Sequence, residues 1–231
     1  ADLIELVLAN TSIERLRITS VGPHEIDERF ISIVNQPRVA PHLHLALQSG
    51  SPTVLKRMKR WYNLQQYRRA VRRLKQEIPE IGITTDVIVG FPGETEAEFE
   101  ESYQFVREMG FAKLHVFPFS ARRGTAAAGY PDQVPAPVKA RRSARLRELG
   151  EELHASFLND QFNRDVDVLL EHEVHADGVD GKAIWSGLTG NYARVYVPVE
   201  PGTDYSNRFV RARTVDRYED GLLAGQPAAI W

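Results

Sequence analysis

The sequence contains no cysteine among its 231 residues. This absence excludes disulfides, thiolate zinc sites, cysteine nucleophiles and any iron–sulfur cluster held by cysteines of this chain. It is typical of a protein from a reducing compartment, and we expect a cytoplasmic location. No hydrophobic run approaches the roughly 18 residues that a membrane-spanning helix needs, so we expect no membrane segment.

Several familiar catalytic signatures are also missing. The sequence has no GxGxxG, GxxxxGK[ST], HExxH or GxSxG segment, which argues against a self-contained nucleotidase or hydrolase of those kinds. Acidic and basic residues nearly balance, with 31 of the first kind and 29 of the second. The chain begins with Ala1 and shows no signal-peptide pattern, and we expect it to be a piece of a longer protein.

Four short apolar stretches are typical of β-strands, and each is followed by a helical pattern. They recur at the spacing of a βαβ unit, which predicts a parallel sheet. The stretches are Arg15–Thr19, Leu43–Leu47, Thr84–Val89 and Leu114–Phe119. Small or polar residues follow each of them, and the carboxyl ends of parallel strands are where α/β folds place their functional sites.

Local signals mark the helices between these strands. Ser51–Pro52 predicts one helix start. Thr95 and Glu98 form a capping box for another helix, which Gly110 should end. Asn63 precedes a third helix, whose apolar stripe consists of Leu64, Tyr67, Val71, Leu74 and Ile78.

The pattern changes after a Pro-rich linker at 131–137 and a long helix from about Lys139 to Phe162. From Asn163 on, apolar and polar residues alternate in short stretches separated by glycines, Gly178 among them, which predicts a small all-β barrel. The preceding part holds only four βα units, whereas a closed eight-stranded barrel needs about 250 residues. We therefore expect two domains, residues 1–160 and 163–231, the first an open sheet or an incomplete barrel.

The stretch Lys56–Lys75 holds nine basic residues and no acid, with Trp61, Tyr62 and Tyr67 interleaved. Segregated cations with aromatic neighbours are typical of a surface that binds a phosphate backbone. The alternative is a solvated helix face balanced by the acidic helix at 94–108. A second basic stretch begins at Arg122. The residues that we expect to bind RNA are Arg57, Arg60, Arg122 and Arg123.

Histidines and one carboxylate lie on the expected strands. His42 and His44 share one face of a strand because side chains alternate, and with His115 they could hold a metal ion. Packed, hydrogen-bonded histidines are the simpler interpretation. Asp86 interrupts a strand otherwise fit for burial, so it should be paired inside the sheet or face a ligand.

Six segments together carry a family resemblance. They are Arg15–Ser20, His42–Gly50, Thr85–Thr95, Lys113–Ser120, Arg123–Thr125 and Asp132–Pro135. In this order they resemble the radical S-adenosylmethionine (SAM) tRNA methylthiotransferases, which place a methylthio group on adenosine 37. The strings LHVFPFS and RGT are most similar to the branch acting on N6-threonylcarbamoyladenosine. The terminal β region is similar to the family's RNA-binding TRAM domain.

The resemblance implies a fold and a cofactor site. The fold would be an N-terminally truncated radical SAM partial (β/α) barrel, with strands three to six of six present, followed by the TRAM-like β-barrel. SAM would lie across the carboxyl ends of the strands, and the tRNA anticodon stem-loop would be the partner. The residues implied to contact SAM are Gln48, Ser49, Val89, Gly90, Phe91, Val116, Phe117 and Pro118.

The sequence also departs from the family. Its CxxxCxxC motif, the glycine–glutamate motif after the second strand and the N-terminal domain are absent, and Ala40 stands where relatives often have cysteine. The missing cluster would cleave SAM to the radical that acts on C2 of adenine, so we expect this chain to be inactive alone. It would lack the [4Fe–4S] clusters of the full-length enzyme. Two alternatives stay open: a stand-alone RNA-binding module, and a metal-dependent barrel hydrolase using His42, His44 and His115.

Overall fold

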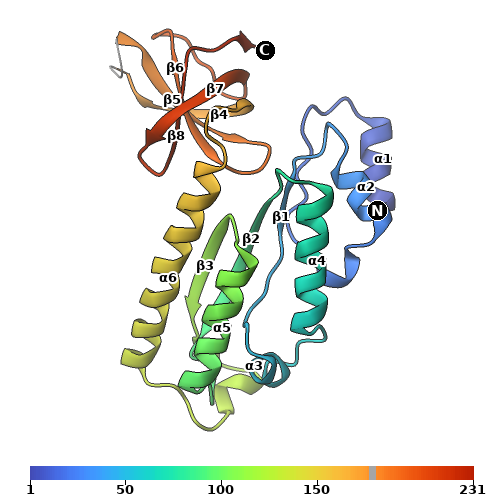
Figure 1. The fold of residues 1–231 in the computed structure, drawn as a ribbon, viewed down its shortest axis with the longest axis vertical. Coiled ribbons are helices and arrows are strands. Elements are labelled where there is room, and N and C mark those ends of the chain that lie inside the picture. The colour runs from blue at the N-terminus through green and yellow to red at the C-terminus, as the bar shows by residue number, and fades with distance from the viewer. Residues whose placement is uncertain (177–180) are drawn as a thin grey trace. The chain divides into compact units, whose positions relative to one another are not determined.

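A computed structural model describes residues 1–176 and 181–231 of the chain. It divides into two compact units, Ala1–Ala155 and Ser156–Trp231, whose elements are labelled in Figure 1. The division falls inside the long helix α6 (Ala136–Asn159), shortly before the boundary expected at 160–163. Gly178 of the expected β-barrel lies outside the described residues.

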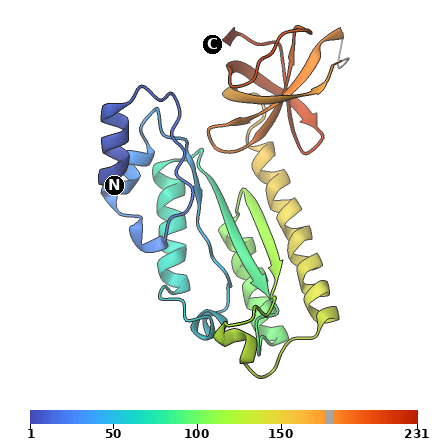
Figure 2. The ribbon, with the colours of Figure 1, turned by 180° about the vertical axis from the view of Figure 1, so that it is seen from behind.

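The first unit is built on a three-stranded parallel sheet of order β1–β2–β3. The strands are β1 (His42–His44), β2 (Gly82–Val89) and β3 (Lys113–Pro118). The helices are α1 (Asp2–Asn10), η1 (Pro23–Glu25), α2 (Glu28–Val34), α3 (Pro52–Arg57), α4 (Leu64–Glu77), α5 (Glu96–Met109), η2 (Ala126–Gly129) and most of α6. Helices α4, α5 and α6 lie along one face of the sheet, and Figure 2 shows the opposite face without them.

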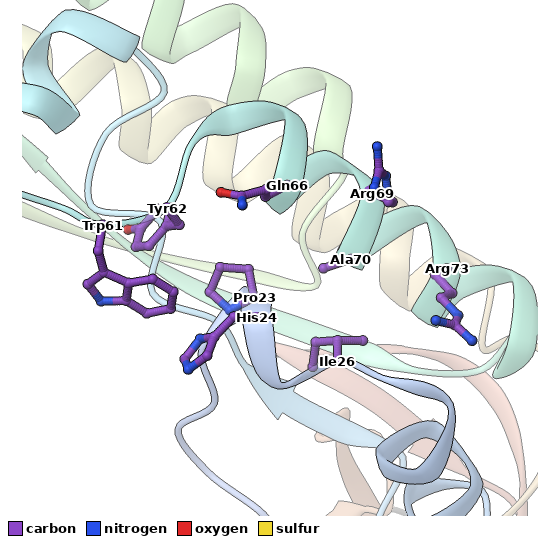
Figure 3. Close-up of a pocket in the computed structure, with 9 residues that line it drawn as sticks. All are labelled: Pro23, His24, Ile26, Trp61, Tyr62, Gln66, Arg69, Ala70 and Arg73. Carbon is purple, nitrogen blue, oxygen red and sulfur yellow. The ribbon is translucent and has the colours of Figure 1, made fainter.

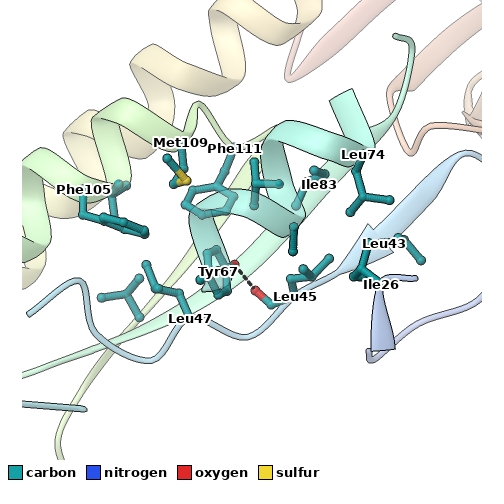
Figure 4. Close-up of a cluster of buried hydrophobic side chains, with 14 of the residues drawn as sticks. Ile26, Leu43, Leu45, Leu47, Tyr67, Leu74, Ile83, Phe105, Met109 and Phe111 are labelled. Atoms are coloured by element: carbon teal, nitrogen blue, oxygen red, sulfur yellow. Dashed lines mark hydrogen bonds between the residues drawn. The ribbon is translucent and has the colours of Figure 1, made fainter. Parts of the chain in front are cut away.

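The core of this unit lies between the sheet and those helices (Figure 4). Tyr67, from the predicted stripe of α4, is fully buried, and its ring centroid lies 6.0 Å from that of Phe105 and 6.3 Å from that of Phe111. The other stripe residues are buried or packed against this core. The prediction of one helix face turned to the sheet is confirmed.

Most of the helix signals in the sequence act as predicted. Asn63 and Thr95 cap α4 and α5 through side-chain oxygens, and Gly110 ends α5 in the left-handed region with a φ of 59°. Ser51 precedes α3, but its side chain makes no capping hydrogen bond; its hydroxyl donates to the Glu101 carboxylate at 2.6 Å.

The segment expected as the first strand, Arg15–Thr19, forms no continuous ladder. Isolated parallel bridges join Leu16 to Val39 and Ser20 to His44. The bridged positions are four residues apart on the first segment and five apart on the second. The register therefore slips by one residue between the bridges, and a regular strand cannot run through both.

The expected strand Leu43–Leu47 is shorter in the structure, because its ladder ends at His44. Beyond that point side chains replace part of the backbone pairing. The Leu45 carbonyl accepts a hydrogen bond from the Tyr67 hydroxyl at 2.6 Å. The segment stays extended beside β2 without forming a regular strand.

The second unit is a small all-β barrel, as the sequence predicted. Its strands are β4 (Asp165–His175), β5 (Ala183–Thr189), β6 (Arg194–Val199), β7 (Phe209–Tyr218), β8 (Gly221–Ala224) and β9 (Ala229–Ile230). They pair in the order β4–β5–β6–β8–β7–β9, and a further β4–β7 pairing closes the sheet. Among the described residues, no helix has the length and apolar character that a membrane crossing requires.

Candidate active-site groove

The two faces of the parallel sheet differ in chemistry, because side chains alternate along each strand. One face carries the buried apolar residues that pack on the helices. On the other face the parallel register aligns His44 with Thr84, Asp86 with His115, and Ile88 with Phe117. A polar row therefore crosses the open face and leads to an apolar end.

Hydrogen bonds join the polar row. His44 Nδ1 lies 3.0 Å from the Thr84 hydroxyl, and its Nε2 lies 3.3 Å from Asp86 Oδ2. His42 Nε2 lies 3.3 Å from the same Thr84 hydroxyl. Burial lowers the pKa of His42 to about 3, so this imidazole is neutral. The ring centroid of His115 lies 6.1 Å from that of His44.

These histidines do not form a metal site in the ranges that the structure describes. No group of three or more His, Cys, Asp or Glu side chains in residues 1–176 and 181–231 could hold a metal ion. His42 and His44 both contact a threonine hydroxyl instead. The hydrolase alternative is therefore left without a ligand set among these residues.

A groove of about 650 Å³ opens at the carboxyl ends of the strands. Its wall combines an amide, two cations, a carboxylate and an apolar surface. The lining residues are Gln48, Arg60, Asp86, Ile88, Phe117, Pro118, Phe119, Ser120, Arg122, Thr125 and Ala127. This volume is typical of sites for small molecules. Asp86 has the expected partner in the sheet, His44, and it also lines the groove.

Gln48 enters the groove from an unusual backbone conformation. Its φ is 65°, in the left-handed region that favours glycine. Two backbone hydrogen bonds to β2 hold it there: its N–H donates to the Asp86 carbonyl and its carbonyl accepts from Ile88 N–H, both at 2.8 Å. A non-glycine residue held in this way is typical of a functional position.

The residues implied to contact SAM do not all point into the groove. Gln48, Phe117 and Pro118 line it. Ser49 is fully buried, and its hydroxyl lies 3.1 Å from the Ser102 hydroxyl on α5. The role of Ser49 in the structure is therefore to join the end of the β1 segment to a helix.

Of four further residues implied to contact SAM, three have side chains engaged elsewhere and the fourth is a glycine. Val89 is buried in the core, and Val116 packs against it. The Phe91 ring lies 5.2 Å from that of Phe119. Gly90 has a φ of 71°, and a Cβ there would come within 2.2 Å of the Lys139 side chain. Any contact of these four with a cofactor would involve mainly their backbone.

Two residues that sequence reasoning missed fix the turn at Gly90. Glu94 Oε2 accepts from Gly90 N–H at 2.6 Å and from an Arg142 guanidinium N–H at 2.8 Å. Both side chains are almost fully buried, at 1% and 4% exposure. Burial raises the pKa of Glu94. The acid is visible in the GFPGE string, but nothing near it in sequence indicates a partner 48 residues away.

The four arginines expected to bind RNA have different environments. Arg60 and Arg122 line the groove, and Arg123 is exposed. The guanidinium of Arg57 is occupied, because it donates twice to Glu98 on α5, at 2.9 and 2.8 Å. Arg57 therefore has a structural partner and is less available to an external ligand.

The rest of the basic stretch divides in the same way. Arg68 and Arg72 on α4 both donate to the Glu108 carboxylate on α5. Lys75 donates to the carbonyls of Met109 and Gly110 at the end of that helix. For these residues the interpretation of a basic face balanced by the acidic helix is correct.

The Arg57–Glu98 pair predicts a pH dependence of stability. The hydrogen bonds from Arg57 lower the pKa of Glu98 from 4.5 to about 2. A carboxylate with a depressed folded-state pKa stabilises the protein above its ordinary pKa, and the contribution is lost as the pH falls through the folded-state pKa.

We expect urea midpoints to fall between pH 4.5 and about 2, with a smaller fall in Glu98→Gln. An equal fall in both proteins would contradict this, and Glu148→Gln, at an exposed carboxylate, is the control.

Residues 1–106, which contain β1 and β2, match a known family model. Over residues 1–106 the chain matches the radical SAM superfamily. It is 39% identical over 194 residues to threonylcarbamoyladenosine tRNA methylthiotransferase MtaB of Bacillus subtilis, over 84% of this chain and 43% of that protein. It is 36% identical over 234 residues to the tRNA-2-methylthio-N(6)-dimethylallyladenosine synthase of Nitratidesulfovibrio vulgaris strain Hildenborough, over 100% of this chain and 51% of that protein. The chain spans about half the length of the curated relatives it matches.

A solved structure supports the radical SAM fold. Coproporphyrinogen III oxidase (HemN) from Escherichia coli, a radical SAM enzyme, superposes with a TM-score of 0.52 at 13% identity. The match covers 92% of this chain and 50% of HemN. The expectation of a partial radical SAM barrel is therefore confirmed.

The superfamily implies SAM and a [4Fe–4S] cluster, and the residues present fit only the first. The groove offers Arg60 for a carboxylate, Asp86 for an ammonium or hydroxyl group, and Phe117 as an apolar surface for a purine. The cluster finds no ligands, because the chain has no cysteine.

Proposed function

We propose that the chain is part of a tRNA methylthiotransferase that installs a 2-methylthio group on N6-threonylcarbamoyladenosine at position 37. The observation that carries the proposal is the groove, where an amide, a carboxylate and cations meet an apolar wall at the carboxyl ends of the strands. The similarity to MtaB and to dimethylallyladenosine synthases supports tRNA as the substrate class. We place this activity in the cytoplasm.

Each part of the chain has a role in this proposal. The groove residues would bind and orient SAM, which when bound supplies the adenosyl group for radical chemistry. The anticodon stem-loop would contact Arg60, Arg122 and Arg123, and the β-barrel would act as a TRAM-like RNA-binding domain. The chain alone would be inactive, because it has no cysteine to hold a cluster.

The cofactor half of the proposal is tested by titrating the 231-residue chain with SAM and monitoring binding by NMR chemical shifts. We expect Arg60→Gln to weaken SAM binding about tenfold, because a charge-assisted hydrogen bond to a carboxylate is lost. Arg72→Gln is the matched control, since Arg72 is bound to Glu108 on α5. No shift of any groove residue at millimolar SAM would overturn this half, and RNA binding without SAM binding would favour the stand-alone RNA-binding module.

The substrate half is tested with two modified anticodon stem-loops. We expect the stem-loop with N6-threonylcarbamoyladenosine to bind more tightly than the one with dimethylallyladenosine, because Arg122 can pair with the threonyl carboxylate. The preference should diminish in Arg122→Gln. A preference for dimethylallyladenosine would assign the chain to the other branch.

A further inference from the structure

A second hollow lies between η1 and helix α4. Its volume is about 170 Å³, and its wall includes Pro23, His24, Trp61, Arg69 and Arg73 (Figure 3). The hollow and the groove are adjacent along the chain, because Arg60 lines the groove and Trp61 lines the hollow.

Trp61 is a large aromatic residue in an exposed but fixed position. It keeps 62% of its surface exposed, whereas Tyr62 and Tyr67 from the same basic stretch are buried. His24 and Tyr62 hold its ring edge to face, with centroid distances of 4.0 and 5.6 Å. An exposed aromatic ring held by its neighbours can stack on a planar ligand with little loss of side-chain entropy.

Two cations of α4 line this hollow, one helical turn apart. No ion pair joins Arg69 to an acid in the described part of the chain. Arg73 lies 3.3 Å from Glu28, a side chain that is 91% exposed. Arg68 and Arg72 on the same helix bond instead to Glu108. On helix α4, Arg68 and Arg72 are therefore paired with Glu108, whereas Arg73 is paired with an exposed glutamate and Arg69 has no ion pair in the described part of the chain.

We propose that this hollow binds a single-stranded segment of RNA, with a base stacked on Trp61 and backbone phosphates on Arg69 and Arg73. Stacking on an aromatic ring together with cations along a path is the usual chemistry of single-strand recognition. An acidic protein surface would satisfy the cations but would leave Trp61 without a planar partner. The proposal rests on the proposed function, in which the chain handles tRNA.

The test is fluorescence anisotropy of a labelled anticodon stem-loop with the 231-residue chain at several salt concentrations. We expect Trp61→Ala to weaken binding about tenfold, and Trp61→Phe to retain most of it, because stacking needs an aromatic face. Arg69→Gln with Arg73→Gln should lower the slope of log Kd against log salt by about 1.4, as expected for two phosphate contacts on a single strand. Glu28→Gln should tighten binding, because it removes an acid beside Arg73.

Arg72→Gln is the matched control, since it removes one charge from the same helix outside the hollow. If Arg72→Gln reduced the affinity for the stem-loop as much, per charge removed, as the Arg69 and Arg73 variants do, the proposal would be overturned. Binding would then depend on the overall positive charge of the surface. Unchanged binding in Trp61→Ala would also overturn it, while leaving tRNA binding intact. Failure of the unmodified chain to bind the stem-loop would overturn both this proposal and the tRNA part of the proposed function. If Trp61→Ala weakened the binding of polyglutamate as much as it weakens the binding of the stem-loop, an acidic protein would be identified as the partner instead. Circular dichroism of each variant confirms that it is folded.

Discussion

Replacing Arg142 by methionine is expected to lower the free energy of unfolding of the α/β unit by about 3–5 kcal/mol, the usual effect of leaving a buried charge without its partner. Arg142 is 4% exposed and donates to the Glu94 carboxylate, to the Glu94 carbonyl and to Glu96. Its guanidinium carbon also lies 5.4 Å from the Phe99 ring centroid. Methionine fills similar space but leaves the Glu94 carboxylate in the interior without a cation.

Urea unfolding followed by far-UV circular dichroism measures this loss. The loss should be larger at about pH 8 than at about pH 5. Without Arg142, the folded protein has to keep Glu94 protonated to avoid a buried charge. Protonating Glu94 costs more free energy as the pH rises above the pKa of this carboxyl in the unfolded chain. The double variant Glu94→Gln with Arg142→Met should recover much of the stability. A double variant as unstable as Arg142→Met would show that packing of the arginine, and not the orphaned carboxylate, causes the loss.

Replacing Tyr67 by alanine is expected to have a comparable effect, about 3–5 kcal/mol, because it opens a cavity at the centre of the core. Tyr67 is fully buried among the rings of Tyr62, Phe105 and Phe111. Tyr67→Phe is the matched control. It removes only the hydroxyl, which donates to the Leu45 carbonyl (Figure 4) and lies 3.3 Å from the Thr85 hydroxyl, and should cost about 1 kcal/mol.

The same urea titration distinguishes packing from hydrogen bonding at Tyr67. The Leu45 carbonyl also accepts from the Thr85 hydroxyl, so it keeps a donor in Tyr67→Phe. A loss in Tyr67→Phe as large as that in Tyr67→Ala would contradict the cavity explanation. It would assign the main role to the hydroxyl that joins α4 to the extended segment after β1.

Local features of this fold could be predicted from the sequence because their causes are local. Asn63 and Thr95 find their hydrogen-bond partners three residues away. The spacing of Tyr67, Val71 and Leu74 determines which side of α4 is buried. In the same way, alternation along the last third of the chain was enough to predict an all-β barrel.

Features that depend on distant partners could not be predicted. Glu94 and Arg142 are 48 residues apart, and Arg68 and Glu108 are 40 apart. The sequence therefore shows a basic stretch without showing which of its cations are already neutralised. The prediction of a first strand at Arg15–Thr19 was wrong for a similar reason, since the slip of register between its two bridges is set by the neighbouring segment.

In the groove, too, some features could be predicted from the sequence and others could not. The small and polar residues after each strand placed it at the carboxyl ends, and Gln48, Arg60 and Phe117 are there. The direction of each side chain was less predictable. Ser49 and Val89 adjoin groove residues in sequence but are buried in the interior, Val89 because neighbours along a strand face opposite sides.

The backbone of Gln48 also bears on how this protein can be engineered. Its left-handed φ of 65° costs roughly 1 kcal/mol in any residue with a Cβ, and nothing in glycine. A redesign guided by thermal stability alone would therefore choose glycine at this position. It would gain a more robust fold and remove an amide from the groove. Selection for ligand binding and selection for stability thus favour different residues at position 48.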